Sequence, residues 1–121
     1  MRQALIVDDS RLTRKLVRRI LARLDFEVSE AEDGDVALVH CESHVPDVIL
    51  LDWNMPEMDG LEFLIRLGQM PTGDKPKVVF CTTENQKERI AAAISAGADE
   101  FVMKPFDEEV IKSKLEQVGL L

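Results

Sequence analysis

The sequence is poor in cysteine and has no long apolar run. Its two cysteines, Cys41 and Cys81, are too few for a disulfide framework, so we expect reduced thiols and a cytoplasmic protein. No apolar stretch approaches the roughly 20 residues that a membrane helix needs. The apolar start, Ala4 to Val7, runs directly into two aspartates. We therefore expect neither a signal peptide nor a membrane span.

Positive charge is also scarce: the chain has 23 acidic and 15 basic residues, and its net charge is −8. This balance argues against general nucleic-acid binding, in which contacts to phosphate dominate the affinity. The charge is uneven, however, because residues 1–25 hold seven basic and three acidic side chains. Two interpretations remain open for this basic segment: a solvated helix face, or a docking surface for an acidic partner or an anionic ligand.

The chain of 121 residues fits one domain, 1–121, and its 45% hydrophobic content is enough for a core. Short apolar runs alternate with helical patterns, which predicts a parallel sheet with helices on both faces. The expected strands are Ala4–Val7, Phe26–Ala31, Val48–Leu51, Val78–Cys81 and Phe101–Met103. The expected helices are Arg11–Leu24, Val36–Glu42, Leu61–Leu67, Lys87–Ala96 and Glu108–Val118.

Strand composition predicts the order of the sheet. The first, third and fourth strands are unbroken apolar runs, as in strands that are buried on both faces. The second contains Glu27 and Glu30, and the fifth starts beside Glu100, so both belong at edges. We predict a single doubly wound five-stranded α/β sheet in the order 2-1-3-4-5, with five flanking helices. Ligands of such sheets bind outside the carboxyl ends of the strands.

The first helix has an apolar stripe of leucine and isoleucine, with arginines opposite. Leu12, Leu16, Ile20 and Leu24 recur every four residues, and we expect this stripe to face the sheet. Near the end of the second helix, His40, Cys41 and His44 allow two interpretations, a transition-metal site or ordinary surface residues. The surface interpretation is the simpler one.

Polar residues directly follow four of the expected strands. These residues are Asp8 and Asp9, Asp52, Thr82, and Lys104. Two carboxylates about 4 Å apart repel by about 4 kcal/mol at an effective dielectric near 20, and a divalent cation removes that cost. Oxygen donors with few protein ligands favour Mg²⁺. No Ser-His-Asp or Cys-His arrangement competes as nucleophile, so Asp52 is the candidate that accepts a phosphoryl group.

Several motifs occur in an order and at spacings that match one family. They are Ile6-Val7-Asp8-Asp9-Ser10, Leu51-Asp52-Trp53-Asn54-Met55-Pro56 with Met58-Asp59-Gly60, Ala96-Gly97-Ala98, and Lys104-Pro105-Phe106. The sequence resembles the receiver domain of two-component response regulators, and within that family the stand-alone chemotaxis regulators. The resemblance covers the whole chain and implies a flavodoxin-like fold.

The resemblance implies a role for each matching residue. Asp52 would be the phosphoacceptor, with a sensor histidine kinase or histidine phosphotransfer protein as phosphohistidine donor. Asp9 and Asp52 would bind Mg²⁺ directly, Asp8 through water, and Asn54 through its backbone carbonyl. Lys104 would bind the phosphoryl group. The chain would catalyse only its own phosphoryl transfer and autodephosphorylation.

The resemblance also implies a switch. Thr82 would be the switch hydroxyl and Phe101 the switch aromatic, where the chemotaxis regulators usually have tyrosine. An output protein would bind the face formed by the fourth helix, fifth strand and fifth helix of a monomer. Candidate contacts on that face are Lys87, Ile90, Ile94, Phe101 and Lys112. For Ile90 and Ile94 a second interpretation, as ordinary core residues, remains open. Phosphorelay transfer and chemotaxis or motility are both open as pathways.

Three alternatives remain. An aspartate-nucleophile phosphatase of the haloacid dehalogenase type needs a second carboxylate two residues after its nucleophile, where this chain has Asn54. A flavodoxin-like electron carrier needs a first loop that binds phosphate, which Asp8 and Asp9 would repel. A receiver-like module that docks without phosphorylation is compatible with every residue named here.

Overall fold

The computed structural model describes residues 1–53, 55, 58–71, 76–82, 87–104 and 107–121. Three features named in the sequence analysis lie outside this description: Asn54, Pro105 and the side chain of Lys87. The strands are β1 (Arg2–Val7), β2 (Phe26–Ala31), β3 (Val48–Asp52), β4 (Lys77–Thr82) and β5 (Glu100–Met103). The helices are α1 (Arg11–Arg23), α2 (Gly34–Ser43), α3 (Gly60–Gln69), α4 (Lys87–Ser95) and α5 (Glu108–Gln117).

The five strands form one parallel sheet in the order β2-β1-β3-β4-β5. The predicted order is confirmed, and so are the two edges. All of β3 is buried, whereas β2 has exposed side chains at Glu27 and Glu30. The apolar runs therefore identified the strands that have a helix layer on both faces.

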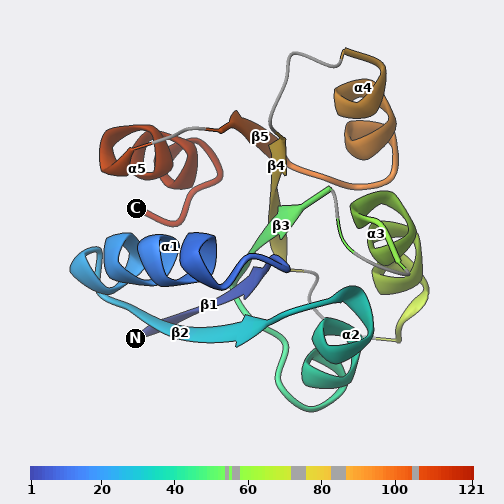
Figure 1. The fold of residues 1–121 in the computed structure, drawn as a ribbon, viewed down its shortest axis with the longest axis horizontal. Helices are drawn as coiled ribbons and strands as arrows, with labels where there is room; N and C mark the ends of the chain where they lie inside the picture. The colour runs from blue at the N-terminus through green and yellow to red at the C-terminus, as the bar shows by residue number, and fades with distance from the viewer. Residues whose placement is uncertain (54, 56–57, 72–75, 83–86, 105–106) are drawn as a thin grey trace.

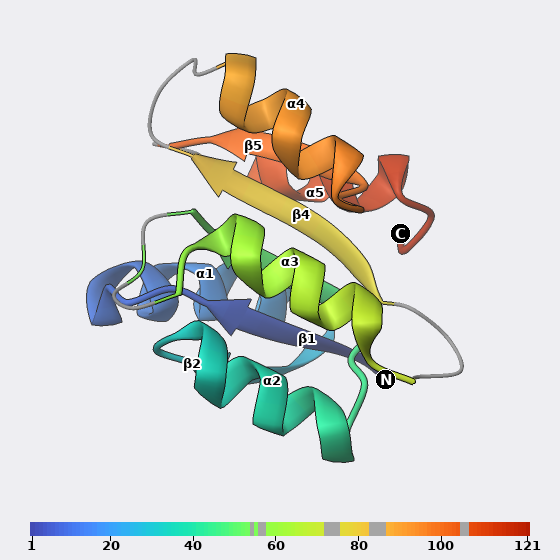
Figure 2. The ribbon, with the colours of Figure 1, turned by 90° about the vertical axis from the view of Figure 1, so that its right-hand side faces the viewer.

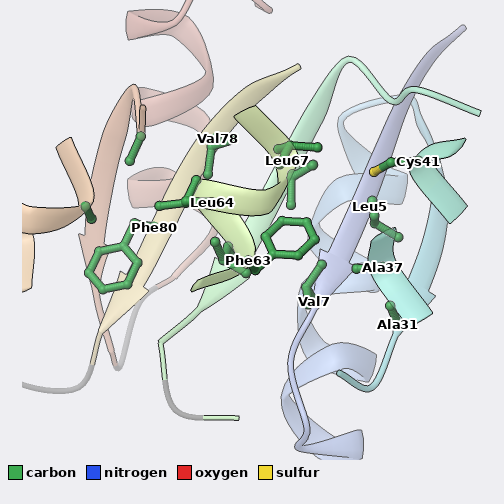
Figure 3. Packing of buried hydrophobic residues seen from close by; sticks show 14 of the residues in the cluster. Leu5, Val7, Ala31, Ala37, Cys41, Phe63, Leu64, Leu67, Val78 and Phe80 are labelled. Atoms are coloured by element: carbon green, nitrogen blue, oxygen red, sulfur yellow. The ribbon is translucent and has the colours of Figure 1, made fainter. Parts of the chain in front are cut away.

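Helices cover the sheet on both faces (Figures 1 and 2). Side chains of α1 and α5 pack on one face, and those of α2, α3 and α4 pack on the other. Figure 3 shows the second layer, where Phe63 of α3 and Phe80 of β4 lie among aliphatic side chains. Both rings are fully buried. The two helix layers thus enclose the sheet, and the loops lie at the ends of its strands.

The predicted stripe of α1 is partly wrong. Leu12 is 79% exposed and Leu16 is 51% exposed, while Val17, Ile20 and Leu21 are buried against the sheet. An α-helix has 3.6 residues per turn, so a series spaced by four rotates by about 40° at every step. The first two leucines therefore rotate away from the face that Ile20 contacts.

Cys41 also differs from the surface interpretation, because it is fully buried in the layer of α2. Burial raises the pKa of its thiol to about 11, so it stays protonated at neutral pH. His40 is half-buried and His44 is exposed. No helix of the described residues has the length and apolar character that crossing a membrane requires.

Capping side chains fix the starts of four helices. Ser10, Asp33, Asp59 and Asp107 each accept a hydrogen bond from a backbone N–H in the first turn of the helix that follows. Gly97, after α4, has a φ of +119°, a conformation that favours glycine. These caps hold the helix starts beside the strand ends.

Candidate functional site

The register of the sheet brings the predicted polar residues to one edge. Val7 pairs with Leu51, Asp52 with Cys81, and Thr82 with Met103. Asp8 follows Val7, so it lies level with Asp52 on the neighbouring strand. The strand arrows end on the same side of the molecule in Figure 2. Asp8, Asp52, Thr82 and Lys104 therefore lie together at the carboxyl end of the sheet.

Three carboxylates meet there and form the acidic cluster, Asp8, Asp9 and Asp52. One oxygen of each lies within 4.8 Å of the others. Asp8 and Asp52 are buried and Asp9 is exposed, so the cluster opens to solvent on the Asp9 side. Among the described residues, no other group of three or more His, Cys, Asp or Glu side chains has this spacing.

Lys104 joins two members of the acidic cluster. Its Nζ donates to Asp8 Oδ2 at 2.9 Å and to Asp52 Oδ1 at 3.1 Å. The backbone N–H of Lys104 donates to the carbonyl of Thr82 at 2.7 Å, which ties the end of β5 to the end of β4. The ammonium group thus lies where it neutralises part of the buried negative charge.

Backbone contacts hold Asp8 and Asp52 in place. The Ser10 N–H donates to Asp8 Oδ1 at 2.8 Å, and Arg14 Nη1 donates to the Asp8 carbonyl at 2.7 Å. On the other strand, the Gly60 N–H donates to the Trp53 carbonyl at 2.9 Å. A Cβ on Gly60 would lie 2.8 Å from the Asp52 carbonyl oxygen. Only glycine lets α3 start this close to the end of β3.

The electrostatics of the site are dominated by burial. Burial and then the charge of Asp8 raise the pKa of the Asp52 carboxyl to about 6, against a lowering effect of Lys104. Burial lowers the pKa of Lys104, but its hydrogen bond to Asp8 and the charges of Asp52 and Asp8 outweigh burial and raise it. A charged lysine therefore faces a carboxylate that is costly to ionise.

The donor set fits a hard divalent cation. All three members of the acidic cluster offer carboxylate oxygen, and no imidazole or thiolate belongs to it. Such a set suits Mg²⁺, which binds one or two carboxylates and keeps several waters. The exposed side of Asp9 leaves room for those waters. The predicted ligands Asp8, Asp9 and Asp52 come together as expected, whereas Asn54 lies outside the described residues.

The predicted switch residues lie next to the site. Thr82 is 2% exposed at the end of β4, and Phe101 is half-buried on β5. Lys114 of α5 lies with Nζ 5.2 Å from the centre of the Phe101 ring, and the same Nζ is 3.3 Å from Glu100 Oε1. A lysine from α5 thus covers the aromatic ring of the edge strand.

The expected output face is only partly exposed. Ile94 and Lys112 are exposed as predicted, whereas Ile90 is partly buried against the core. Phe101 is packed against the same core cluster. The accessible part of this face is therefore smaller than its sequence indicated.

One contact of Trp53, the residue after Asp52, was not found by reasoning from sequence. The Arg89 guanidinium of α4 lies 5.1 Å from the centre of the Trp53 ring, and Trp53 meets Phe80 edge-on at 5.2 Å between ring centroids. Nothing in the spacing of Arg89 predicted this stacking, because it depends on where α4 lies relative to β3. The contact places a cation of α4 on the ring that directly follows the phosphoacceptor candidate in the chain.

Comparison with known families assigns the class of this chain. The model of the response regulator receiver domain matches residues 4–116. The chain therefore belongs to the response regulator receiver family, the family that serves two-component signalling. The resemblance seen in the sequence motifs is confirmed, and so is the flavodoxin-like fold.

Individual relatives narrow the class further. Chemotaxis protein CheY from Listeria monocytogenes is 38% identical over 120 residues, which cover 98% of this chain and 99% of that protein. Chemotaxis protein CheY1 from Helicobacter pylori is 36% identical over 116 residues, 94% of either chain. The solved structure of Vibrio cholerae chemotaxis protein CheY4 superposes with a TM-score of 0.91 at 33% identity, covering 98% of each chain. The chain is homologous to CheY-type regulators.

Proposed function

We propose that this chain is a phosphorylation-dependent switch in which Asp52 accepts a phosphoryl group from a phosphohistidine. The observation that supports this most directly is the position of Asp52, buried beside Asp8 with Lys104 Nζ 3.1 Å from its Oδ1. A buried carboxylate with a cation at one oxygen keeps the other oxygen available for attack. Residues 1–121 would act as one domain.

The transfer needs positioning and charge stabilisation more than covalent chemistry. A carboxylate oxygen of Asp52 attacks the phosphorus, the P–N bond to the donor histidine breaks, and the imidazole leaves with that electron pair. An acyl phosphate on Asp52 results. Lys104 offsets negative charge on the phosphoryl oxygens, and the Thr82 hydroxyl donates to one of them.

The acidic cluster would hold the cation that assists this step. Asp8, Asp9 and Asp52 supply the ligands, and Mg²⁺ when bound neutralises charge on the transferring phosphoryl group. Water attack on the phosphorus later breaks the P–O bond to Asp52 and returns the carboxylate. That autodephosphorylation would be the only turnover of the chain.

Phosphorylation would act on the face of α4, β5 and α5. A hydrogen bond to the phosphoryl group draws Thr82 inward, and the half-buried Phe101 moves into the space that Thr82 leaves. This is a local charge change that biases a two-state element. We propose that a sensor histidine kinase or phosphotransfer protein supplies the phosphoryl group to a cytoplasmic monomer, and that an output protein reads the changed face.

Intact-mass spectrometry after treatment with acetyl phosphate and Mg²⁺ tests the proposal. We expect a gain of one phosphoryl group, absent in Asp52→Asn. Asp25→Asn is the matched control, because Asp25 is exposed with a positive φ that asparagine tolerates. An unmodified wild type, or modification that survives in Asp52→Asn, would contradict the proposal. Continuous hydrolysis of many phosphate esters would favour the phosphatase alternative.

Trp53 gives an independent signal because it directly follows Asp52. We expect Mg²⁺ to quench its fluorescence and beryllofluoride, an analogue of the phosphoryl group, to enlarge the response. A docking module that works without phosphorylation would bind its partner equally with and without beryllofluoride.

A further inference from the structure

A second group of metal-binding side chains lies at the opposite end of the sheet. His40 is in the last turn of α2, and His44 is the residue that ends this helix. A cavity of about 240 Å³ lies between this end of α2 and the first two strands. The described residues that line it all have polar side chains and are Gln3, Glu27, Ser29, His40 and His44. Figure 2 shows α2 ending away from the strand arrowheads, so this cavity is remote from Asp52.

The two imidazole rings lie close to each other at the end of α2. Their centroids are 5.9 Å apart, and the ring planes make an angle of 35°. Two imidazole nitrogens on one ion, each at about 2.0–2.1 Å and at a tetrahedral angle, bring ring centroids to about 5 Å. A shared ion therefore requires the centroids to approach by about 1 Å and one nitrogen of each ring to turn toward the ion. Rotation about the side-chain bonds of His44, which is exposed, can supply both movements.

The surroundings favour a cation over an anion. Glu27 contributes a carboxylate to the cavity from the exposed edge strand β2. The C-terminal end of α2 adds the partial negative charge of its free carbonyl groups. None of the described residues that line the cavity is a lysine or an arginine. Two imidazoles and one carboxylate with a further open position match the ligand sets that zinc uses in proteins.

We propose that His40, His44 and Glu27 bind a divalent transition-metal ion, with Zn²⁺ as the best match among common cellular cations. Gln3 and Ser29 would hydrogen-bond the water in the open position. The three donors are farther apart than those of the acidic cluster, so they converge on the ion only when it binds. This site would fasten the end of α2 to the edge of the sheet, and it is independent of Mg²⁺ and of phosphorylation.

Neighbouring candidate ligands do not compete for the ion. Cys41 lies between the two histidines in sequence, but its side chain is fully buried in the core of the sheet layer. The acidic cluster is the other cation site among the described residues, and it offers oxygen only. Imidazole binds Zn²⁺, Ni²⁺ and Cu²⁺ far better than it binds Mg²⁺. The two sites therefore differ in the metal ion that each prefers.

Calorimetric titration with ZnCl₂ in saturating Mg²⁺ tests the proposal, with the Asp9→Asn variant as the background that weakens the acidic cluster. We expect one site of micromolar affinity that Asp9→Asn leaves unchanged. His40→Gln and His44→Gln should each weaken it at least tenfold, and Glu27→Gln about threefold. These exposed or half-buried residues tolerate glutamine, and circular dichroism verifies the fold of each variant.

Two further measurements make the result decisive. Zn²⁺ should shift the imidazole signals of both histidines in NMR spectra and raise the midpoint of thermal unfolding, and both effects should vanish in the double histidine variant. Binding that persists in the double variant would overturn the proposal, as would a site that saturates only at millimolar Zn²⁺. Neither outcome bears on acceptance of a phosphoryl group by Asp52, which mass spectrometry reports separately.

Discussion

The two ends of the parallel sheet differ in whether their charged side chains are buried or exposed. At the carboxyl end, Asp8 and Asp52 are buried and share the ammonium group of Lys104. At the amino end, Asp47 is exposed and its carboxylate accepts from the Gln3 N–H at 2.7 Å. One end holds charges that repel each other in a low dielectric, and the other keeps its charges in water. Among the residues that the structure describes, the buried charged side chains are those of Asp8 and Asp52, and both lie at the end where a ligand would relieve their repulsion.

The largest effect should come from removing the lysine at the carboxyl end. Lys104→Gln leaves Asp8 and Asp52 without their shared cation, and we expect unfolding free energy to fall by about 3 kcal/mol in the absence of Mg²⁺. Lys77→Gln at the amino end removes an exposed charge and should change stability by less than about 0.5 kcal/mol. Urea denaturation of the two variants measures the contrast. Equal losses of unfolding free energy in the two variants would show that charge is no more buried at the carboxyl end than at the amino end.

Helix α3 spans both ends and offers a second contrast. Gly60→Ala would place a methyl 2.8 Å from the Asp52 carbonyl oxygen and 3.1 Å from the Trp53 Cα, so backbone must move. We expect a loss of about 2 kcal/mol and weaker quenching of Trp53 by Mg²⁺. Gly68→Ala, near the other end of α3, meets nothing within 4 Å and should stabilise by about 0.5–1 kcal/mol. A stabilised Gly60→Ala would contradict the close approach.

The raised pKa of Asp52 predicts a specific dependence of stability on pH. In the unfolded chain this carboxyl ionises near pH 4, whereas burial and Asp8 hold it protonated to about 6 in the folded protein. The folded state binds more protons between these values, so the contribution of Asp52 is most favourable below pH 4 and is lost as pH rises through 6. After allowance for solvent screening, the loss is about 2 kcal/mol.

Thermal denaturation from pH 4 to 7 measures this effect as the difference between wild type and Asp52→Asn. The variant should lack the fall and be the more stable protein at pH 7 without Mg²⁺. Asp25→Asn should keep the fall, because Asp25 is exposed. Adding Mg²⁺ should restore wild-type stability above pH 6 and have little effect below pH 5. Parallel profiles for wild type and Asp52→Asn would exclude a raised pKa at this position.

The same comparison shows which features of the two ends could be predicted from the sequence and which could not. Apolar runs and strand-end residues were enough to predict the sheet order and the meeting of Asp8, Asp9, Asp52 and Lys104, because parallel strands align their carboxyl ends. Leu12 and Leu16 were misplaced, because a four-residue period only approximates the helical repeat. The sequence predicted a helix from Leu61, directly after Gly60, but did not show why glycine is needed there, because the close approach to the Asp52 carbonyl depends on helix placement.

The smallest effect concerns the stacking of Arg89 on Trp53, which sequence did not predict. At 5.1 Å from the ring centre, this contact is worth about 0.5–1 kcal/mol. Arg89→Gln should therefore lower stability only slightly, while it shifts the Trp53 emission maximum and changes the amplitude of the Mg²⁺ quench. Arg89→Lys keeps the cation and should retain most of the signal. If Arg89→Gln leaves Trp53 fluorescence unchanged with and without Mg²⁺, α4 does not report on the carboxyl end, and the contrast between the two ends rests on the acidic cluster alone.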